Sequence, residues 1–68
     1  MKISKQKLTI AAANMGWNFK TLAENSGVSR TTISLILSGK SCRIDTALKL
    51  ANALGVKVGE ITDYTANS

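Results

Sequence analysis

The chain has no histidine, no proline and a single cysteine, Cys42. The absence of histidine removes the commonest general base and metal ligand. One cysteine forms neither an internal disulfide nor a cysteine-based zinc site. The sequence also contains no glycine-rich phosphate loop and no plausible activated nucleophile. We therefore expect a protein that is not an enzyme and that binds no metal and no cofactor.

Long hydrophobic runs are also absent. No apolar run approaches the roughly 20 residues that a bilayer-spanning helix needs, and no signal-peptide core follows the basic start at Met1–Lys5. The 68 residues are enough for one domain. Together with the low cysteine content, these features predict a protein of the reducing cytoplasm with no membrane partner.

Acidic residues are scarce, and the positive charge is unevenly spread. Residues 1–43 carry seven Lys and Arg against one Glu, a net charge of +6. Residues 44–68 carry two Lys against three acidic residues, a net charge of −1. A basic region beside a nearly neutral one is typical of a surface that faces a polyanion.

Apolar residues recur at helical spacing through most of the chain, which predicts an all-α fold. The expected helices span 4–15, 19–26, 30–38, 44–54 and 58–63. Asn18 and Ser29 are predicted N-caps, and Gly27 is a predicted helix end. The core stripes are expected to include Met15 in the first helix and, in the fourth, Ile44, Ala47, Leu48, Ala51 and Leu54. Residues 1–63 would form the domain, and 64–68 a disordered tail.

Residues 19–38 have the pattern of a helix-turn-helix. Ala23 is small enough for two helices to approach closely, and Gly27 tolerates the positive φ of the turn. The residues spaced to be buried are Leu22, Val28, Ile33 and Ile36. The outer face of the second helix of this motif is then small, polar and singly charged, which suits the major groove of DNA.

This chain resembles the lambda-repressor-like Cro/CI family of helix-turn-helix regulators over about residues 8–62. The pieces that carry the resemblance are Leu22-Ala23, Gly27-Val28-Ser29-Arg30, Thr32-Ile33-Ser34, Gly39-Lys40 and residues 48–56. The resemblance implies a compact five-helix domain that binds double-stranded DNA, usually as a homodimer on a palindromic operator. It implies a sequence-specific transcriptional regulator, such as a Cro-like repressor or a modulator of repression from a temperate phage.

The resemblance also implies roles for individual residues. Base contacts are expected from Arg30, Thr31, Thr32, Ser34 and Leu35, with Arg30 suited to guanine and Leu35 to a thymine methyl group. Phosphate contacts are expected from Asn18, Lys20, Ser29, Ser38, Lys40 and Arg43. Dimer contacts are expected from Val56, Val58, Ile61 and Tyr64. The hydroxyl residues are equally compatible with an ordinary solvated helix face.

Several positions depart from the family pattern. Phe19 stands where the family usually has Gln, and Arg43 where a Ser or Thr cap is common. Leu35 and Leu37 are more apolar than usual, so at least one of them should be exposed. Together with Trp17, these apolar residues predict an alternative function, a modulator or anti-repressor that docks on a partner repressor protein. Alternatively, Trp17 and Phe19 pack on the first helix and Leu37 on the fourth.

Overall fold

The computed structural model describes residues 1–62, which form four α-helices and one 3-10 turn. The elements are α1 (Lys5–Asn14), α2 (Phe19–Ser26), α3 (Arg30–Leu37), α4 (Ile44–Leu54) and η1 (Val58–Glu60). The all-α class is confirmed, and α2 and α4 have the predicted bounds. The predicted tail, 64–68, lies outside the described residues.

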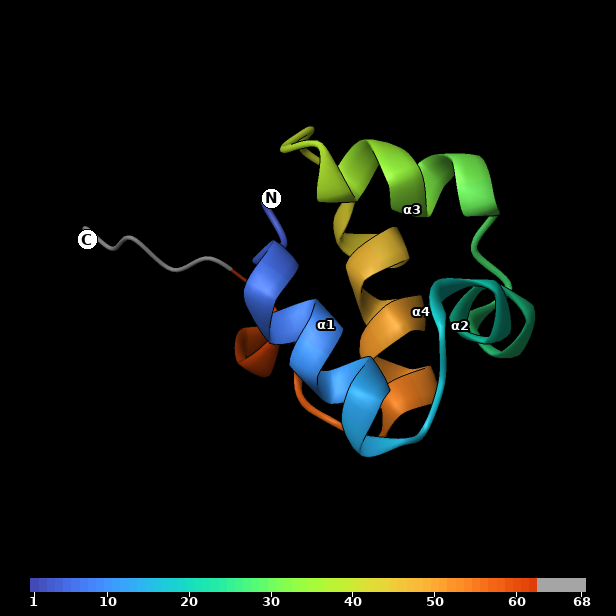
Figure 1. Ribbon diagram of the computed structural model, residues 1–68. Coiled ribbons are helices and arrows are strands. Elements are labelled where there is room, and N and C mark those ends of the chain that lie inside the picture. The colour runs from blue at the N-terminus through green and yellow to red at the C-terminus, as the bar shows by residue number, and fades with distance from the viewer. Residues whose placement is uncertain (63–68) are drawn as a thin grey trace.

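Figure 1 shows how these elements are arranged. The helix α3 lies across one end of the molecule, and α4 runs away from it through the middle of the view, between α1 and α2. The helix α2 packs against both α3 and α4, and α4 also contacts η1. This arrangement leaves the face of α3 that points away from α4 uncovered by any described element (Figure 1).

The fifth helix predicted over 58–63 is not confirmed. Among its described residues the chain forms the three-residue 3-10 turn η1, and the backbone groups that follow it bond to the N-terminal segment. The Ile61 carbonyl accepts a hydrogen bond from the Ser4 N–H at 2.8 Å, and Thr62 pairs with Ile3 in an isolated antiparallel bridge. The Ile61 side chain is fully buried, so the N-terminal segment and η1 close one side of the core together.

Short-range capping sets the ends of the two helices of the helix-turn-helix. The Asn18 Oδ1 accepts from the Thr21 N–H at 2.8 Å, and the Ser29 Oγ accepts from the Thr32 N–H at 3.1 Å. Both predicted N-caps are thereby confirmed. Gly27 ends α2 with φ of +74°, a left-handed conformation that costs other L-residues about 1–2 kcal/mol.

The core contains the predicted residues of the helix-turn-helix, but α4 buries a different stripe of residues from the predicted one. The buried apolar side chains are Ile3, Leu8, Ala12, Leu22, Ala23, Val28, Ile33, Ile36, Ala47, Leu50, Ala51, Leu54 and Ile61. On α4, Leu50 is fully buried, whereas Leu48 is 42% and Ile44 58% exposed. The predicted core roles of Leu48 and Ile44 are therefore wrong.

Two overlapping stripes with the same helical spacing exist on α4, one starting at Ile44 and one at Ala47. Packing against α2 buries the second stripe, which contains Leu50. Met15, the C-cap of α1, is a further residue expected in the core, but it is 46% exposed and that expectation is wrong.

No helix among residues 1–62 combines the length and the hydrophobicity that crossing a bilayer requires.

Candidate nucleic-acid interface

The helix α3 has one face in the core and the opposite face in solvent. Ile33 and Ile36 are buried, and so is Val28 in the turn that precedes the helix. The residues Arg30, Thr31, Ser34 and Leu35 share the shallow outer surface of the helix, which we call the crest. Of the two leucines Leu35 and Leu37, Leu35 is the one that faces solvent, and its side chain is 49% exposed.

Hydroxyl groups at both ends of α3 are partly used within the protein. The Ser29 Oγ donates to the Thr32 Oγ1 at 2.8 Å, and the Ser38 Oγ donates to the Leu35 carbonyl at 2.7 Å. The Thr32 hydroxyl acts as an acceptor in the first bond, so its own hydrogen is free to bind an outside group. A phosphate or a base edge can therefore interact with Thr32 while Ser29 holds the hydroxyl in place.

A cavity of about 240 Å³ lies between the start of α2 and one flank of α3, and we call it the α2-side cavity. Its lining residues are Phe19, Lys20, Arg30, Ile33, Ser34 and Leu37. The apolar members are buried or half-buried, and the polar and charged members are exposed. The cavity thus combines an apolar floor with a cationic rim.

A second cavity, of about 510 Å³, lies on the other flank of α3, and we call it the loop-side cavity. Its lining residues are Thr32, Leu35, Ile36, Lys40, Ser41, Cys42, Arg43 and Thr46. Lys40 and Arg43 are exposed, so they place positive charge on this flank as Lys20 and Arg30 do on the other. The crest of α3, which itself carries Arg30, therefore has cationic side chains on both flanks.

The N-terminal ends of α2 and α3 add to this positive potential. Neither helix has an acidic residue in its first turn, so their free N–H groups and helix dipoles favour an anion. The Asn18 Oδ1 is used in capping α2, which leaves the amide hydrogens of Asn18 to donate outward. Arg43 is the N-cap of α4 and forms no side-chain capping bond, so its guanidinium is not tied to that helix end.

The loop that carries Lys40 and Arg43 is held by the N-terminus of the chain. The Cys42 N–H donates to the Met1 carbonyl at 2.8 Å, and the Met1 ammonium donates to the Cys42 carbonyl at 3.2 Å. Partial burial raises the pKa of the Cys42 thiol, and the nearby N-terminal ammonium offsets part of that rise. The Cys42 thiol therefore keeps its proton up to a higher pH than an ordinary cysteine does.

The residues predicted for DNA contact fall into four groups in the structure. Lys20, Arg30 and Ser34 line the α2-side cavity, whereas Thr32, Leu35, Lys40 and Arg43 line the loop-side cavity. Thr31 lies on the crest with Arg30 and Ser34. Asn18, Ser29 and Ser38 stand at helix ends, with Asn18 before α2 and the two serines before and after α3.

The residues predicted for a protein interface are less exposed. Trp17, Phe19 and Leu37 are half-buried and pack against the core, so Leu35 is the one member of that set with an exposed side chain. Among the expected dimer residues, Ile61 is fully buried and that expectation is wrong, because its side chain fills the core beside Ile3. Val56 and Val58 are half-buried, and Tyr64 lies outside the described residues.

Sequence reasoning did not assign Ser41 and Thr46 to the site, although both line the loop-side cavity. Neither residue belongs to the helix-turn-helix pattern, and their approach to α3 depends on how the loop folds back. Ser41 and Thr46 follow α3 in the chain, and no local sequence pattern indicates that they lie against it.

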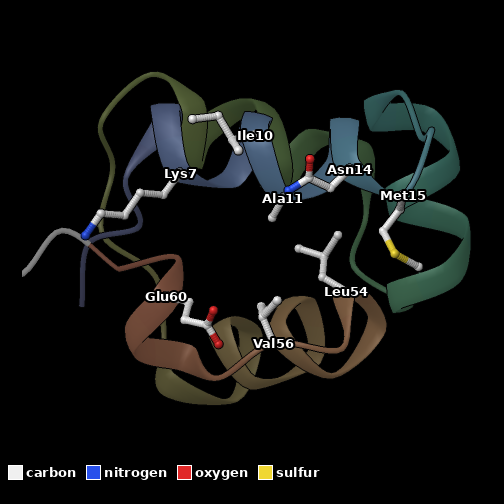
Figure 2. Close-up of a pocket in the computed structure, with 8 residues that line it drawn as sticks. All are labelled: Lys7, Ile10, Ala11, Asn14, Met15, Leu54, Val56 and Glu60. Carbon is white, nitrogen blue, oxygen red and sulfur yellow. The ribbon is translucent and has the colours of Figure 1, made fainter.

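A third cavity, of about 220 Å³, lies apart from α3, and none of the predicted DNA-contact residues lines it. Figure 2 shows side chains of α1, among them Ile10 and Asn14, on one side of it, and Met15 just beyond the end of that helix. Leu54, Val56 and Glu60 stand on the other side. Within residues 1–62, no group of three or more His, Cys, Asp or Glu side chains is placed to hold a metal ion.

An exposed helix that follows a tight turn, with positive charge on both flanks, defines the class of helix-turn-helix DNA-binding domains. Comparison with known families agrees with this geometry. Residues 7–67 match the family described as the Cro/C1-type HTH DNA-binding domain, and the chain belongs to that family. No curated protein and no solved structure gives a significant match to the chain.

Proposed function

We propose that this protein is a sequence-specific transcriptional regulator, a Cro-like repressor, that reads the major groove with α3. The observation that carries the proposal is the exposed crest of α3, with Lys20 on one flank and Lys40 and Arg43 on the other. Cations on both flanks match the two phosphate backbones that border a groove, and a small polar crest allows close approach to the bases.

The proposed base contacts come from the crest and its edges. Arg30 stands in the first turn of α3 and can donate two hydrogen bonds to the O6 and N7 atoms of a guanine. Thr31, Thr32 and Ser34 offer hydroxyls to base edges, and Leu35 offers an apolar contact to a thymine methyl group. These residues would supply the sequence preference.

The proposed phosphate contacts come from residues around the crest, which are Asn18, Lys20, Ser29, Ser38, Lys40 and Arg43. The cations among them displace counterions from the DNA, which gives affinity without sequence information. Asn18 presents its amide N–H donors beside the N-terminus of α2, and Ser29 stands at the N-terminus of α3, where phosphate is favoured.

A homodimer is part of the proposal. The helix α3 has eight residues and is about 12 Å long, so one copy reads only a few base pairs. Two copies on a palindromic site would place their α3 helices one turn of DNA apart, about 34 Å, and would double the number of base contacts.

Selection from a pool of random duplexes, followed by salt titration on the selected site, tests this function. We expect enrichment of a palindromic site and an affinity that falls steeply with salt. The three phosphate-contacting cations of each copy correspond to a slope of log K against log salt of about −3 per protomer. If no sequence is enriched at low salt and all duplexes bind alike, the proposed function is wrong.

A second candidate function rests on Leu35. Its half-exposed side chain borders the loop-side cavity, so a protein partner with an apolar anchor and acidic surroundings would also fit there. This candidate is a modulator of repression that docks on the DNA-binding domain of a partner repressor. Calorimetric titration against a repressor encoded beside this gene tests it, with Leu35→Asp as the disruptive variant. Equal affinity of the wild type and Leu35→Asp would exclude docking at this surface.

A further inference from the structure

The α2-side cavity has a chemistry that phosphate binding does not explain. Phe19, Ile33 and Leu37 form its floor, and Ile33 is only 1% exposed, so the floor is closed by the core. Lys20, Arg30 and Ser34 stand around it with exposed side chains. An apolar floor penalises a polar group that lacks a partner, whereas the rim attracts a polyanion.

One group on duplex DNA satisfies both conditions. The major-groove edge of a base pair presents hydrogen-bond donors and acceptors, and its apolar group is the C5-methyl group of thymine. The same methyl group is present in 5-methylcytosine. A base that carries this methyl group would place it against the apolar floor of the cavity. The phosphates of the same DNA strand would then pass Lys20 and Arg30 at the rim.

We propose that the α2-side cavity receives the C5-methyl group of a thymine and that Phe19 is the residue that makes this contact specific. This inference rests on the proposed function, since it concerns a base within the recognised site. Phe19 is the first residue of α2, and the capping bond from the Thr21 N–H to the Asn18 Oδ1 fixes the backbone beside it. Arg30 lines the same cavity, so it reads the adjacent base.

Leu35 and Phe19 lie on different flanks of α3. Leu35 lines the loop-side cavity and the crest, whereas Phe19 and Leu37 line the α2-side cavity. A thymine methyl group held by Phe19 is therefore a different one from any that touches Leu35. This separation makes the two contacts distinguishable at different positions of the DNA site.

Replacing thymine by deoxyuracil, one position at a time in the selected duplex, tests the proposal because only the methyl group is removed. Affinities are measured for the wild type, Phe19→Ala and Leu35→Ala. At one thymine in each half-site, we expect loss of the methyl group to weaken the wild type by about fourfold, as burial of one methyl group implies. At that position Phe19→Ala should bind thymine and uracil equally, and Leu35→Ala should still discriminate.

Phe19 is half-buried, so Phe19→Leu serves as a second variant that keeps an apolar floor. It should retain most of the discrimination, and thermal melts of each variant verify that it is folded. A matched duplex with 5-methylcytosine or cytosine at the same position identifies the source of the methyl group. Improved binding of 5-methylcytosine over cytosine supports recognition of the methyl group itself, and equal binding restricts the contact to thymine.

The outcomes separate this proposal from the proposed function. If the wild type selects a DNA site but tolerates uracil at every position, the methyl contact is absent and the proposal fails alone. Persistence of the discrimination in Phe19→Ala, or its loss only in Leu35→Ala, also overturns it. If the wild type selects no site, the proposed function fails, and this inference fails with it.

Discussion

Ser29 and Thr32 hold each other at the start of α3 through two hydrogen bonds. The Ser29 Oγ accepts from the Thr32 N–H at 3.1 Å and donates to the Thr32 Oγ1 at 2.8 Å. One serine thus caps the helix and orients a hydroxyl beside the crest. The stability of α3 and the geometry of its outer surface are therefore linked at this pair.

Loss of the Ser29 cap should lower the thermal stability of the domain by a measurable amount. We expect Ser29→Ala to lower the free energy of unfolding by about 1 kcal/mol, because an N–H at the helix start loses its acceptor. For a domain of this size, that corresponds to a decrease in Tm of about 4–8 °C. Ser34→Ala, a crest hydroxyl with no capping role, is the control and should leave Tm nearly unchanged.

Ser29→Asp separates the two roles of the position. Aspartate also caps helices, so the thermal stability should stay close to that of the wild type. The added negative charge would face DNA phosphates, and we expect the affinity for every duplex to fall. Unchanged DNA affinity in Ser29→Asp would place the start of α3 away from the DNA backbone.

Arg30 and Lys40 should differ in what their removal changes. We expect Arg30→Ala to cost about 1–3 kcal/mol on the preferred site and to relax the preference at one base pair. Lys40→Ala should weaken all duplexes alike and reduce the salt slope by about 1, because it loses a phosphate contact. Binding assays with the selected site and single-base variants decide this, and a uniform loss in both variants would contradict base reading by Arg30.

The buried stripe of α4 predicts a contrast between two leucines two residues apart. Leu50→Ala leaves a cavity at a fully buried site and should lower the free energy of unfolding by about 2–5 kcal/mol. Leu48→Ala, at a site that is 42% exposed, should cost about 1 kcal/mol or less. Denaturant unfolding measures both, with Leu50→Val as a milder variant if the first does not fold. Equal losses at the two positions would rule out the observed orientation of α4.

The Cys42 thiol should react slowly at neutral pH. Burial raises its pKa, so the thiolate fraction at a given pH is smaller than in the unfolded chain. We expect alkylation by iodoacetamide to reach half its maximal rate at a higher pH in the folded protein than in denaturant. The folded state holds this proton more tightly, so its contribution to stability is full below the unfolded pKa and is lost as pH rises through the folded pKa.

The N-terminal ammonium near Cys42 provides the matched control for that titration. Its positive charge lowers the pKa of the thiol and so offsets part of the effect of burial. Acetylation of the amine should shift the alkylation profile to still higher pH. A shift in the opposite direction would contradict the pairing of Met1 with Cys42.

Helix bounds and the helix-turn-helix followed from local chemistry in the sequence. Asn18 and Ser29 bond to N–H groups three residues away, and Gly27 ends α2 by its own backbone freedom, so these features depend on a few neighbouring residues. Arg30 was placed at the start of α3 for the same reason. The family match over residues 7–67 agrees with what these local patterns predicted.

Other features needed contacts between distant parts of the chain. Two stripes of equal spacing exist on α4, and packing against α2 decides that Leu50, and not Leu48, is buried. The described residues of the predicted fifth helix form one 3-10 turn, and Thr62 beyond it pairs with Ile3. Phe19 and Arg30, which stand at the starts of different helices, share a cavity because α2 packs against α3. The sequence by itself determined where α3 lies and how it is capped, since those bonds are local. Only the tertiary structure decided what surrounds the helix, because that depends on which faces the helices bury against one another.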